Sequence, residues 1–344
     1  MTAYADGHEQ LAAWLGARVP ALTAPLVSYR IGSGQSNLTF LLRDAESREW
    51  VLRRPPRSDE DGGEHGVLRE ARILHALATT AVPVPAVVAT GAGEAGIDGP
   101  FVVTERAPGA ALSDERDAAQ LPASERAELG TNVIAALAAL HETDPGTVGL
   151  SELAPHDGYI ARQIRRMSRN WRYWGQHSDA DGMWRRCLDR LENRAPRPQR
   201  VTLVHGDYRL ANVLVDRARI TAVLDWELCT LGDPIADLAW LLDDWRAPED
   251  PAIAVPSPTR AGGFAHRADI VAEYAGRTGL DADALDYYRA FTHWKAATLL
   301  QGVLVRRRSG ELGEHGAPDL VALEDTIRYL LHEALDLARQ YRTP

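Results

Sequence analysis

The hydrophobic residues of this chain follow two patterns along its length. In the first part, short apolar runs next to turn residues predict strands over 26–30, 38–43 and 49–53, and another from 100 into a turn at 109. Elsewhere apolar residues recur every three or four positions, the spacing of an amphipathic helix. This spacing predicts helices over 9–18, 67–77, 123–142, 159–174, 181–192, 234–244, 265–278, 283–307 and 319–341. The pattern therefore predicts an α+β protein whose second part is mostly helical.

Three short β-rich runs interrupt the predicted helices of the second part, over 201–204, 213–215 and 220–224. Asp207 lies in a short loop after the first run, Asn212 follows five residues later, and Asp225 comes directly after the third run. A strand, a tight loop and a strand aim such side chains at one point. Oxygen ligands bind Mg²⁺, and phosphoryl transfer needs a held metal and an oriented hydroxyl. These residues therefore favour phosphoryl transfer from a nucleotide to a hydroxyl group.

The segment HGDYRLANVLVD (205–216), with DWE at 225–227, resembles the catalytic loop and the metal-binding Asp of protein kinases. It is more similar to the aminoglycoside phosphotransferase family, which has His-Gly-Asp at this place. Together with AVLDWELCTLGDPIADLAWL (222–241), it resembles the branch whose kinase-like domain is fused to acyl-CoA dehydrogenases, family members ten and eleven. The resemblance implies a bilobal protein-kinase-like fold, with a small antiparallel-sheet N-lobe and a larger, mostly helical C-lobe.

The resemblance also implies a role for each residue of the loop. Asp207 would accept or orient the proton of the substrate hydroxyl, while Asn212 and Asp225 would ligate Mg²⁺. Arg209 occupies the place of a kinase loop Lys and would contact the transferred phosphate. An ordinary turn is the alternative explanation of a lone His-Gly-Asp. Further elements in the expected order make that alternative weak.

The first of these elements is a small-residue loop between the first two predicted strands, Ile31 to Asn37. Small residues let the backbone approach phosphates closely, and the N–H groups of such loops attract anions. This loop is predicted to contact the phosphates of ATP. The contacts are assigned to Gly32, Ser33, Gly34, Ser36 and Asn37.

A cation at the end of the run 49–53 takes the place where kinases hold the α- and β-phosphates with Lys. The residue here is Arg53, and the adjacent Arg54 leaves open which of the two binds phosphate. On the following helix, Glu70 is predicted to pair with Arg53. The alternative role for Glu70 is that of a solvated carboxylate that pairs with a nearby Arg of its own helix. Such a surface ion pair contributes little to stability.

The segment 100–109, PFVVTERAPG, resembles the kinase hinge, where backbone groups bind adenine. Glu105 and Ala107 would line the adenine site. With 344 residues, 45% of them hydrophobic, the chain can bury a sizeable core in two lobes of one catalytic unit. We therefore expect an N-lobe over 1–104, a hinge over 105–109 and a C-lobe over 110–344.

The net charge of −10, from 48 acidic against 38 basic residues, argues against a general nucleic-acid or membrane-surface role. The sequence has no long apolar run, and its first residues, MTAYADGHEQ, lack a signal-peptide pattern. We therefore expect a cytoplasmic protein. The two cysteines, Cys187 and Cys229, are too few for a disulfide framework or a Cys-rich zinc site. We expect Cys229, which lies close to Asp225 in the sequence, to be a small buried thiol.

Three further features have two interpretations each. Arginines 162, 165, 166, 169 and 172 form either a solvated helix face or a site for the phosphates of coenzyme A. The Pro-rich stretch 247–263 is either a connector or a cover over the substrate cleft. Asp233 and Asp237 resemble extra metal ligands, but the family resemblance favours a role in bracing the catalytic loop.

Together these features predict an ATP-dependent small-molecule kinase that phosphorylates a hydroxyl group, with a hydroxyacyl-CoA as its preferred substrate. One alternative is an antibiotic phosphotransferase acting on aminoglycosides or macrolides. Because such drugs are cationic, the charge of the cleft distinguishes the two. A second alternative is a pseudokinase that binds nucleotide without turnover and works with an acyl-CoA dehydrogenase.

Overall fold

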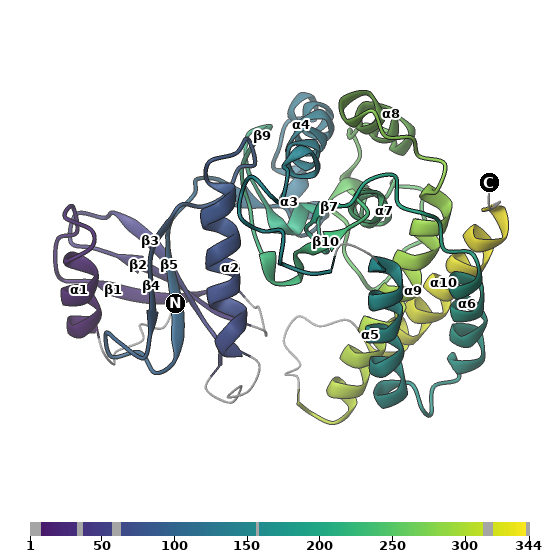
Figure 1. The fold of residues 1–344 in the computed structure, drawn as a ribbon, viewed down its shortest axis with the longest axis horizontal. Helices are drawn as coiled ribbons and strands as arrows, with labels where there is room; N and C mark the ends of the chain where they lie inside the picture. Colours follow the sequence, from purple (N-terminus) through teal and green to yellow (C-terminus); the bar gives the residue numbers. More distant parts are fainter. Residues whose placement is uncertain (1–7, 33–36, 57–62, 156–157, 312–318, 342–344) are drawn as a thin grey trace. The chain divides into compact units, whose positions relative to one another are not determined.

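The computed structural model describes residues 8–32, 37–56, 63–155, 158–311 and 319–341 (Figure 1). The chain forms two compact units. Unit 1 comprises Met1–Ala110, Leu214–Asp216 and Ile220–Leu228, and unit 2 comprises Ala111–Val213, Arg217–Arg219 and Cys229–Pro344. The chain changes from one unit to the other several times between residues 213 and 229. Asp225 therefore belongs to unit 1, whereas Asp207 belongs to unit 2.

Unit 1 is built on an antiparallel sheet, which has five strands among the described residues. Their spatial order is β1 (Val27–Ile31), β2 (Leu38–Arg43), β3 (Glu49–Arg54), β5 (Pro100–Glu105) and β4 (Val87–Ala92). The sequence interpretation missed β4. Its last four residues, Ala-Thr-Gly-Ala, include few good strand formers, so its pairing with β5 determines its conformation.

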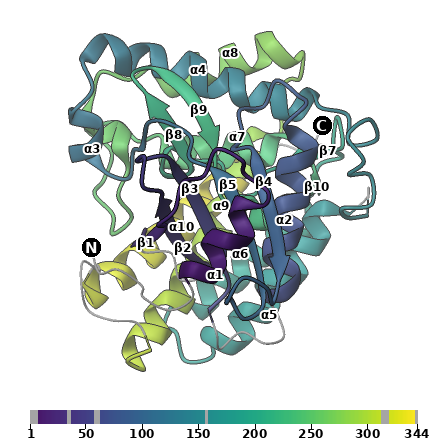
Figure 2. The ribbon, with the colours of Figure 1, turned by 90° about the vertical axis from the view of Figure 1, so that its left-hand side faces the viewer.

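Successive side chains of a strand point to opposite faces, and both faces of this sheet are covered. Figure 2 shows α1 (His8–Gly16) lying across one face, where Leu11 and Leu15 join a core with residues such as Trp50 and Phe101. The helix α2 (Gly63–Leu77) packs on the other face against Val102 of β5. This alternation directs Arg53 toward α2.

Unit 2 is mostly helical, and α9 lies at its centre. The helices are α3 (Glu115–Ala119), α4 (Ala123–Glu142), α5 (Tyr159–Trp174), α6 (Asp181–Asn193), α7 (Ile235–Asp244), α8 (Arg267–Thr278), α9 (Leu285–Arg308) and α10 (Leu320–Gln340) (Figure 1). Side chains of α9 are buried along most of its length, and α5, α6, α7 and α10 pack against it. All predicted helices of this unit are present; the short α3 was not predicted.

Short strands carry the predicted loop residues. In unit 2, β7 (Thr202–Val204) pairs with β10 (Thr230–Gly232), with Val204 opposite Thr230. A second small sheet has the order β6 (Ala110–Ala111), β8 (Val213–Asp216) and β9 (Arg219–Val223). Both cysteines are buried free thiols, as expected for Cys229. Among the residues that the structure describes, no helix is both long and apolar enough to cross a membrane.

Candidate active site

The loop after β7 is held from behind by Asp237, which lies in the first turn of α7. The backbone N–H groups of His205 and Gly206 donate to the two oxygens of Asp237, at 2.6 and 2.8 Å. Gly206 has a φ of +84°, a conformation that favours glycine. Burial acts to raise the pKa of Asp237, but its hydrogen bond with His141 and the loop N–H groups hold that pKa below its ordinary value. The expected bracing role of Asp237 is confirmed.

The structure brings Asp207 and Asn212 together, as predicted. Asn212 Nδ2 donates to Asp207 Oδ2 at 2.8 Å and to the Asp207 carbonyl at 2.9 Å. The other carboxylate oxygen, Oδ1, accepts from Trp240 Nε1 at 2.7 Å. Both oxygens of Asp207 are therefore fixed in orientation, while Asn212 Oδ1 makes no hydrogen bond with a described residue. Such an amide oxygen fits a hard cation such as Mg²⁺.

Lys295 of α9 also supports this loop, and the sequence interpretation missed it. Its Nζ donates to the Gly206 carbonyl at 2.8 Å and lies 4.4 Å from the centroid of the Trp240 ring. Burial lowers the pKa of Lys295 to about 8, against the opposing charges of Asp207 and Asp237. A lysine in an otherwise apolar helical stretch, HWKAATLL, was the available signal.

In unit 1, Arg53 lies between two carboxylates. Arg53 Nη1 is 2.6 Å from Glu70 Oε1, and Arg53 Nη2 is 3.1 Å from Asp225 Oδ1. Arg54 points to the other face of the sheet, with its guanidinium 5.9 Å from the Phe40 ring centroid. Glu70 is only 2% exposed, so the alternative of a solvated helix-face carboxylate is wrong.

Two buried polar atoms of this cluster have no partner in the described part of the chain, Arg53 Nε and Glu70 Oε2. Buried polar groups are usually hydrogen-bonded, so each of these two atoms needs an explanation, and a bound ligand or ion is one. Asp225 has a φ of +65°, and its side chain is 34% exposed. A non-glycine residue in this left-handed region is uncommon and is often found at functional sites.

The predicted magnesium ligands do not form a closed protein cage. Among the described residues, no group of three or more His, Cys, Asp and Glu side chains could hold a metal ion. Mg²⁺ is usually bound by one or two protein oxygens together with substrate phosphates and water. Asn212 Oδ1 in unit 2 and the second oxygen of Asp225 in unit 1 are each oxygen donors of the type that such open coordination uses. That they bind one Mg²⁺ together stays a prediction.

The remaining residues predicted for the nucleotide site belong to unit 1, and the structure describes only some of them. Gly32 has a φ of +72°, and Asn37 directly precedes β2. Ser33, Gly34 and Ser36 lie outside the described residues. Glu105 ends β5 with an exposed side chain, and Ala107 follows, partly buried. Their contacts with nucleotide, like the hinge at 105–109, stay predictions.

Arg209 lies beside a pocket of unit 2. Its Nη2 is 3.1 Å from Asp244 Oδ1, and its Nε is buried with no partner among the described residues. The pocket, of about 70 Å³, is lined by Arg209, Trp240, Asp243, Asp244, Ile253, Val255, Thr292, His293, Ala296 and Leu330. Since Trp240 also binds Asp207, the pocket lies next to the candidate base.

The carboxylates of this pocket are already paired. Asp243 binds Arg289 at 2.9 Å and His293 at 2.9 Å, and it also accepts from Thr292. Burial raises the pKa of Asp244 to about 6, with the charge of Asp207 adding to the effect and Arg209 opposing it. The lining of the pocket is mainly apolar, and Ile253, Val255 and Leu330 contribute to it.

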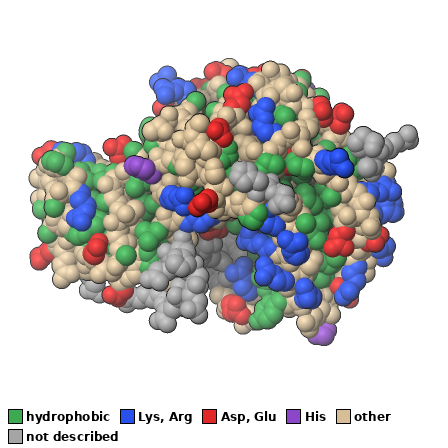
Figure 3. All heavy atoms as spheres, viewed as in Figure 1, with side chains coloured by type: hydrophobic (Ala, Val, Ile, Leu, Met, Phe, Trp, Pro, Cys, Tyr) green, Lys and Arg blue, Asp and Glu red, His purple; other side chains and the backbone are tan. Residues whose placement is uncertain are grey.

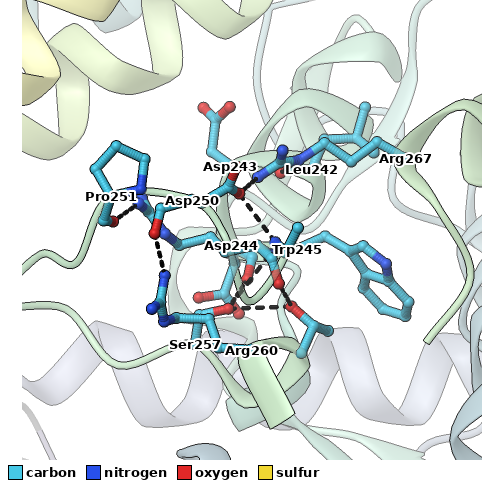
Figure 4. A network of polar contacts seen from close by, with 12 residues as sticks. Leu242, Asp243, Asp244, Trp245, Asp250, Pro251, Ser257, Arg260 and Arg267 are labelled. Carbon is cyan, nitrogen blue, oxygen red and sulfur yellow. Dashed lines mark hydrogen bonds and ion pairs between the residues drawn. The ribbon is translucent and has the colours of Figure 1, made fainter. Parts of the chain in front are cut away.

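The Pro-rich stretch 247–263 contributes to the pocket through Ile253 and Val255, so it is more than a connector. Figure 4 shows the polar contacts that fix the stretch. Arg267 binds Asp250 at 2.6 Å and the Leu242 carbonyl at 3.1 Å, and Arg260 donates to the Asp250 carbonyl.

Comparison with known proteins identifies the family of this chain. The model of the phosphotransferase enzyme family (APH) matches residues 29–272, which is more than half of the chain. The chain belongs to this family. The matched segment includes the catalytic loop, Arg53, Glu70 and Asp225.

Solved structures of the APH phosphotransferase family share the fold. A Ralstonia eutropha protein provisionally named an aminoglycoside phosphotransferase is 28% identical, with a TM-score of 0.79 over 97% of this chain and 98% of that one. A mutant of APH(4)-Ia, in complex with AMP-PNP and hygromycin B, has a TM-score of 0.62 at 19% identity, over 95% of this chain and 97% of its own. The predicted kinase-like α+β fold class is confirmed.

Curated relatives of this APH-family chain carry the name of another enzyme. The mouse acyl-CoA dehydrogenase family member 10 is 32% identical over 90% of this chain, and the rat acyl-CoA dehydrogenase family member 11 is 28% identical over 96%. The chain spans 29% of the length of the first relative and 43% of the second. The predicted branch of the family is confirmed.

The pair Glu70–Arg53 predicts a pH dependence. Burial raises the pKa of Glu70 to about 7, and this outweighs the opposing charge of Arg53. Glu70 is then mostly ionised at pH 8 and mostly neutral at pH 6, so the ion pair that orients Arg53 weakens as the pH falls. We expect the KM for ATP to rise between pH 8 and pH 6, and Glu70→Gln to remove this dependence. The measurement is KM against pH for both proteins; a parallel rise in the variant contradicts the assignment.

Proposed function

We propose that the protein is an ATP-dependent kinase that phosphorylates a hydroxyl group of a small molecule. The observation that carries the proposal is the fixed carboxylate of Asp207, whose oxygens bind Asn212 and Trp240. Asp207 orients the acceptor hydroxyl and receives its proton. The bond between the γ-phosphorus and the β–γ bridging oxygen breaks, a bond to the hydroxyl oxygen forms, and ADP leaves.

We propose ATP and Mg²⁺ as the nucleotide and the metal. Asn212 and Asp225 would ligate Mg²⁺, which neutralises charge on the phosphates when it is bound. Arg53, held by Glu70, would bind phosphate oxygens, since its fork suits pairs of oxygens. The unpartnered Arg209 Nε supports the proposed contact of Arg209 with the transferred phosphate. The complexes of APH(4)-Ia with AMP-PNP and with ADP support the choice of an adenine nucleotide.

For the acceptor we propose a hydroxyacyl-CoA. The names of the curated relatives support an acyl-CoA, and the same names support a functional link to an acyl-CoA dehydrogenase. The pocket beside Trp240 suits the apolar end of an acyl chain, because Ile253, Val255 and Ala296 line it. An acyl chain there would bring its hydroxyl near Asp207.

The alternative of an antibiotic phosphotransferase is less well supported. Cationic drugs need carboxylates that are free to pair with their ammonium groups. In the pocket beside Trp240, Asp243 is paired with Arg289 and His293, and Asp244 with Arg209. The pseudokinase alternative is opposed by the presence of Asp207, Asn212 and Asp225.

The test is purified protein with Mg-ATP and a panel of hydroxyacyl-CoAs that vary in chain length and hydroxyl position, analysed by mass for added phosphate. The control panel contains hygromycin B, a macrolide and the matching acyl-CoAs without a hydroxyl group. We expect phosphate on one or more hydroxyacyl-CoAs and on none of the controls. Phosphorylation of the antibiotics alone would support the alternative enzyme, and tight Mg-ATP binding without any product would support the pseudokinase.

A further inference from the structure

The surface of α5 carries an unusual concentration of positive charge. Its sequence, YIARQIRRMSRNWRYW, contains five arginines and no acidic residue, in a chain whose net charge is −10. The arginines recur at spacings of three and four, while Ile160, Ile164, Met167 and Trp171 are buried on the opposite face. Figure 3 shows basic side chains gathered over this helix. We call four of them the α5 arginine stripe, namely Arg165, Arg166, Arg169 and Arg172.

The α5 arginine stripe has no charge partner in the described part of the chain. All four side chains are exposed, and none forms an ion pair with a described carboxylate. Arg172 makes a hydrogen bond with the Ser168 carbonyl of its own helix, and the other three make none with a described residue. Like charges one helical turn apart destabilise a helix. An anionic ligand would remove this repulsion.

The stripe begins near the catalytic loop. On the preceding turn of α5, Arg162 Nη2 donates to the Leu231 carbonyl of β10 at 2.8 Å, and β10 pairs with β7, which leads into the loop. Arg166 is close enough to Lys295 for its charge to favour the neutral amine there, and Lys295 binds the Gly206 carbonyl. From Arg162 to Arg172 the helix rises about 15 Å. The stripe therefore leads away from the candidate base along α5.

An exposed aromatic side chain lies at the far end of the stripe. Tyr173 is 82% exposed and follows Arg169 by four residues, which places it on the same helix face. The two tryptophans near it in the sequence are structural: Trp171 stacks on Trp184 with ring centroids 4.9 Å apart, and Trp174 packs against Gly302. Exposed aromatic faces beside arginines are typical of surfaces that stack nucleobases.

We propose that the α5 arginine stripe and Tyr173 bind the phosphorylated nucleotide end of the acceptor. This inference rests on the proposed hydroxyacyl-CoA kinase function and assigns the coenzyme A part of that substrate to a surface. Arginine forks bind the diphosphate and the 3′-phosphate, and Tyr173 stacks on the adenine ring. The acyl arm reaches back along α5 toward Asp207.

The test is calorimetric titration of coenzyme A into the full chain, in the presence of saturating Mg-AMP-PNP so that the nucleotide site is occupied. The variants are Arg165→Gln/Arg169→Gln and Tyr173→Ala. The matched control is Arg186→Gln, an exposed arginine of α6. Dephospho-coenzyme A and pantetheine show which phosphates contribute. Thermal unfolding of every variant checks the fold, which exposed side chains should leave unchanged.

We expect the double variant to weaken coenzyme A binding by at least about tenfold, since hydrogen bonds to charged groups are the strong ones. Tyr173→Ala should weaken it less, and Arg186→Gln by less than about twofold. Wild-type affinity in the double variant, equal losses in the control, or no binding of coenzyme A by the wild type would each overturn the proposal. Because the titration measures binding without turnover, it tests the coenzyme A site separately from the proposed phosphorylation.

Discussion

Replacing Asp207 with Asn should lower kcat by about 10²–10⁴-fold, the usual contribution of a positioned proton acceptor. The carboxylate of Asp207 accepts from two donors, Asn212 Nδ2 and Trp240 Nε1. An amide at this position has one acceptor oxygen, so it satisfies only one of these donors and cannot take up the hydroxyl proton. The measurement is steady-state kinetics with the accepted hydroxyacyl-CoA, and the KM for ATP should change little.

The matched control for this prediction is Trp240→Phe. It removes one hydrogen bond to Asp207 and retains the carboxylate, so it separates orientation from proton transfer. We expect a loss of about tenfold in kcat for this variant, as one hydrogen bond to a charged group is removed. Unchanged phosphoryl transfer in Asp207→Asn would show that Asp207 is not the base. Equal losses in both variants would mean that orientation explains the whole effect.

The local parts of the candidate site could be predicted from the sequence, because short-range geometry determines them. Asp207 and Asn212 are five residues apart in one loop, and their contact follows from the strand, loop and strand around them. The sequence left open which of Arg53 and Arg54 binds phosphate, and the structure bears on this only through the faces that the two side chains take. Alternation along β3 places them on opposite faces of the sheet, and the sequence did not show which face α2 covers.

The parts that the sequence did not predict depend on contacts between distant segments. Lys295 lies 89 residues from Gly206, whose carbonyl it binds, and its meaning depends on where α9 packs. Trp240 lies 33 residues from Asp207, and their contact likewise depends on where α7 packs. Residues of α7, α9, α10 and the Pro-rich stretch line the pocket beside Trp240, so no single segment of the sequence predicts it. The strand β4 was missed for a similar reason, since its pairing with β5 outweighs a weak local preference.

Replacing Asp225 with Asn should abolish productive binding of Mg-ATP. The substitution removes the negative charge proposed to ligate Mg²⁺, while an Asn tolerates the left-handed φ of +65° that Asp225 adopts. Ala would add backbone strain to the loss of charge and so confuse the two effects. The amide oxygen can still accept from Arg53 Nη2, so the contact with β3 is retained. We expect kcat/KM for ATP to fall by at least about 100-fold, because metal-held phosphates contribute several kcal/mol.

Calorimetry with Mg-ATP and with ATP plus EDTA measures this effect directly. In the wild type, removal of Mg²⁺ should weaken nucleotide binding, whereas in Asp225→Asn it should have little further effect because the metal site is already lost. Asp207→Asn is the control, since it should bind Mg-ATP with wild-type affinity and fail only in turnover. If Asp225→Asn binds Mg-ATP as tightly as the wild type and loses affinity equally when EDTA is added, then Asp225 is not a magnesium ligand. The metal must then be held by other oxygens.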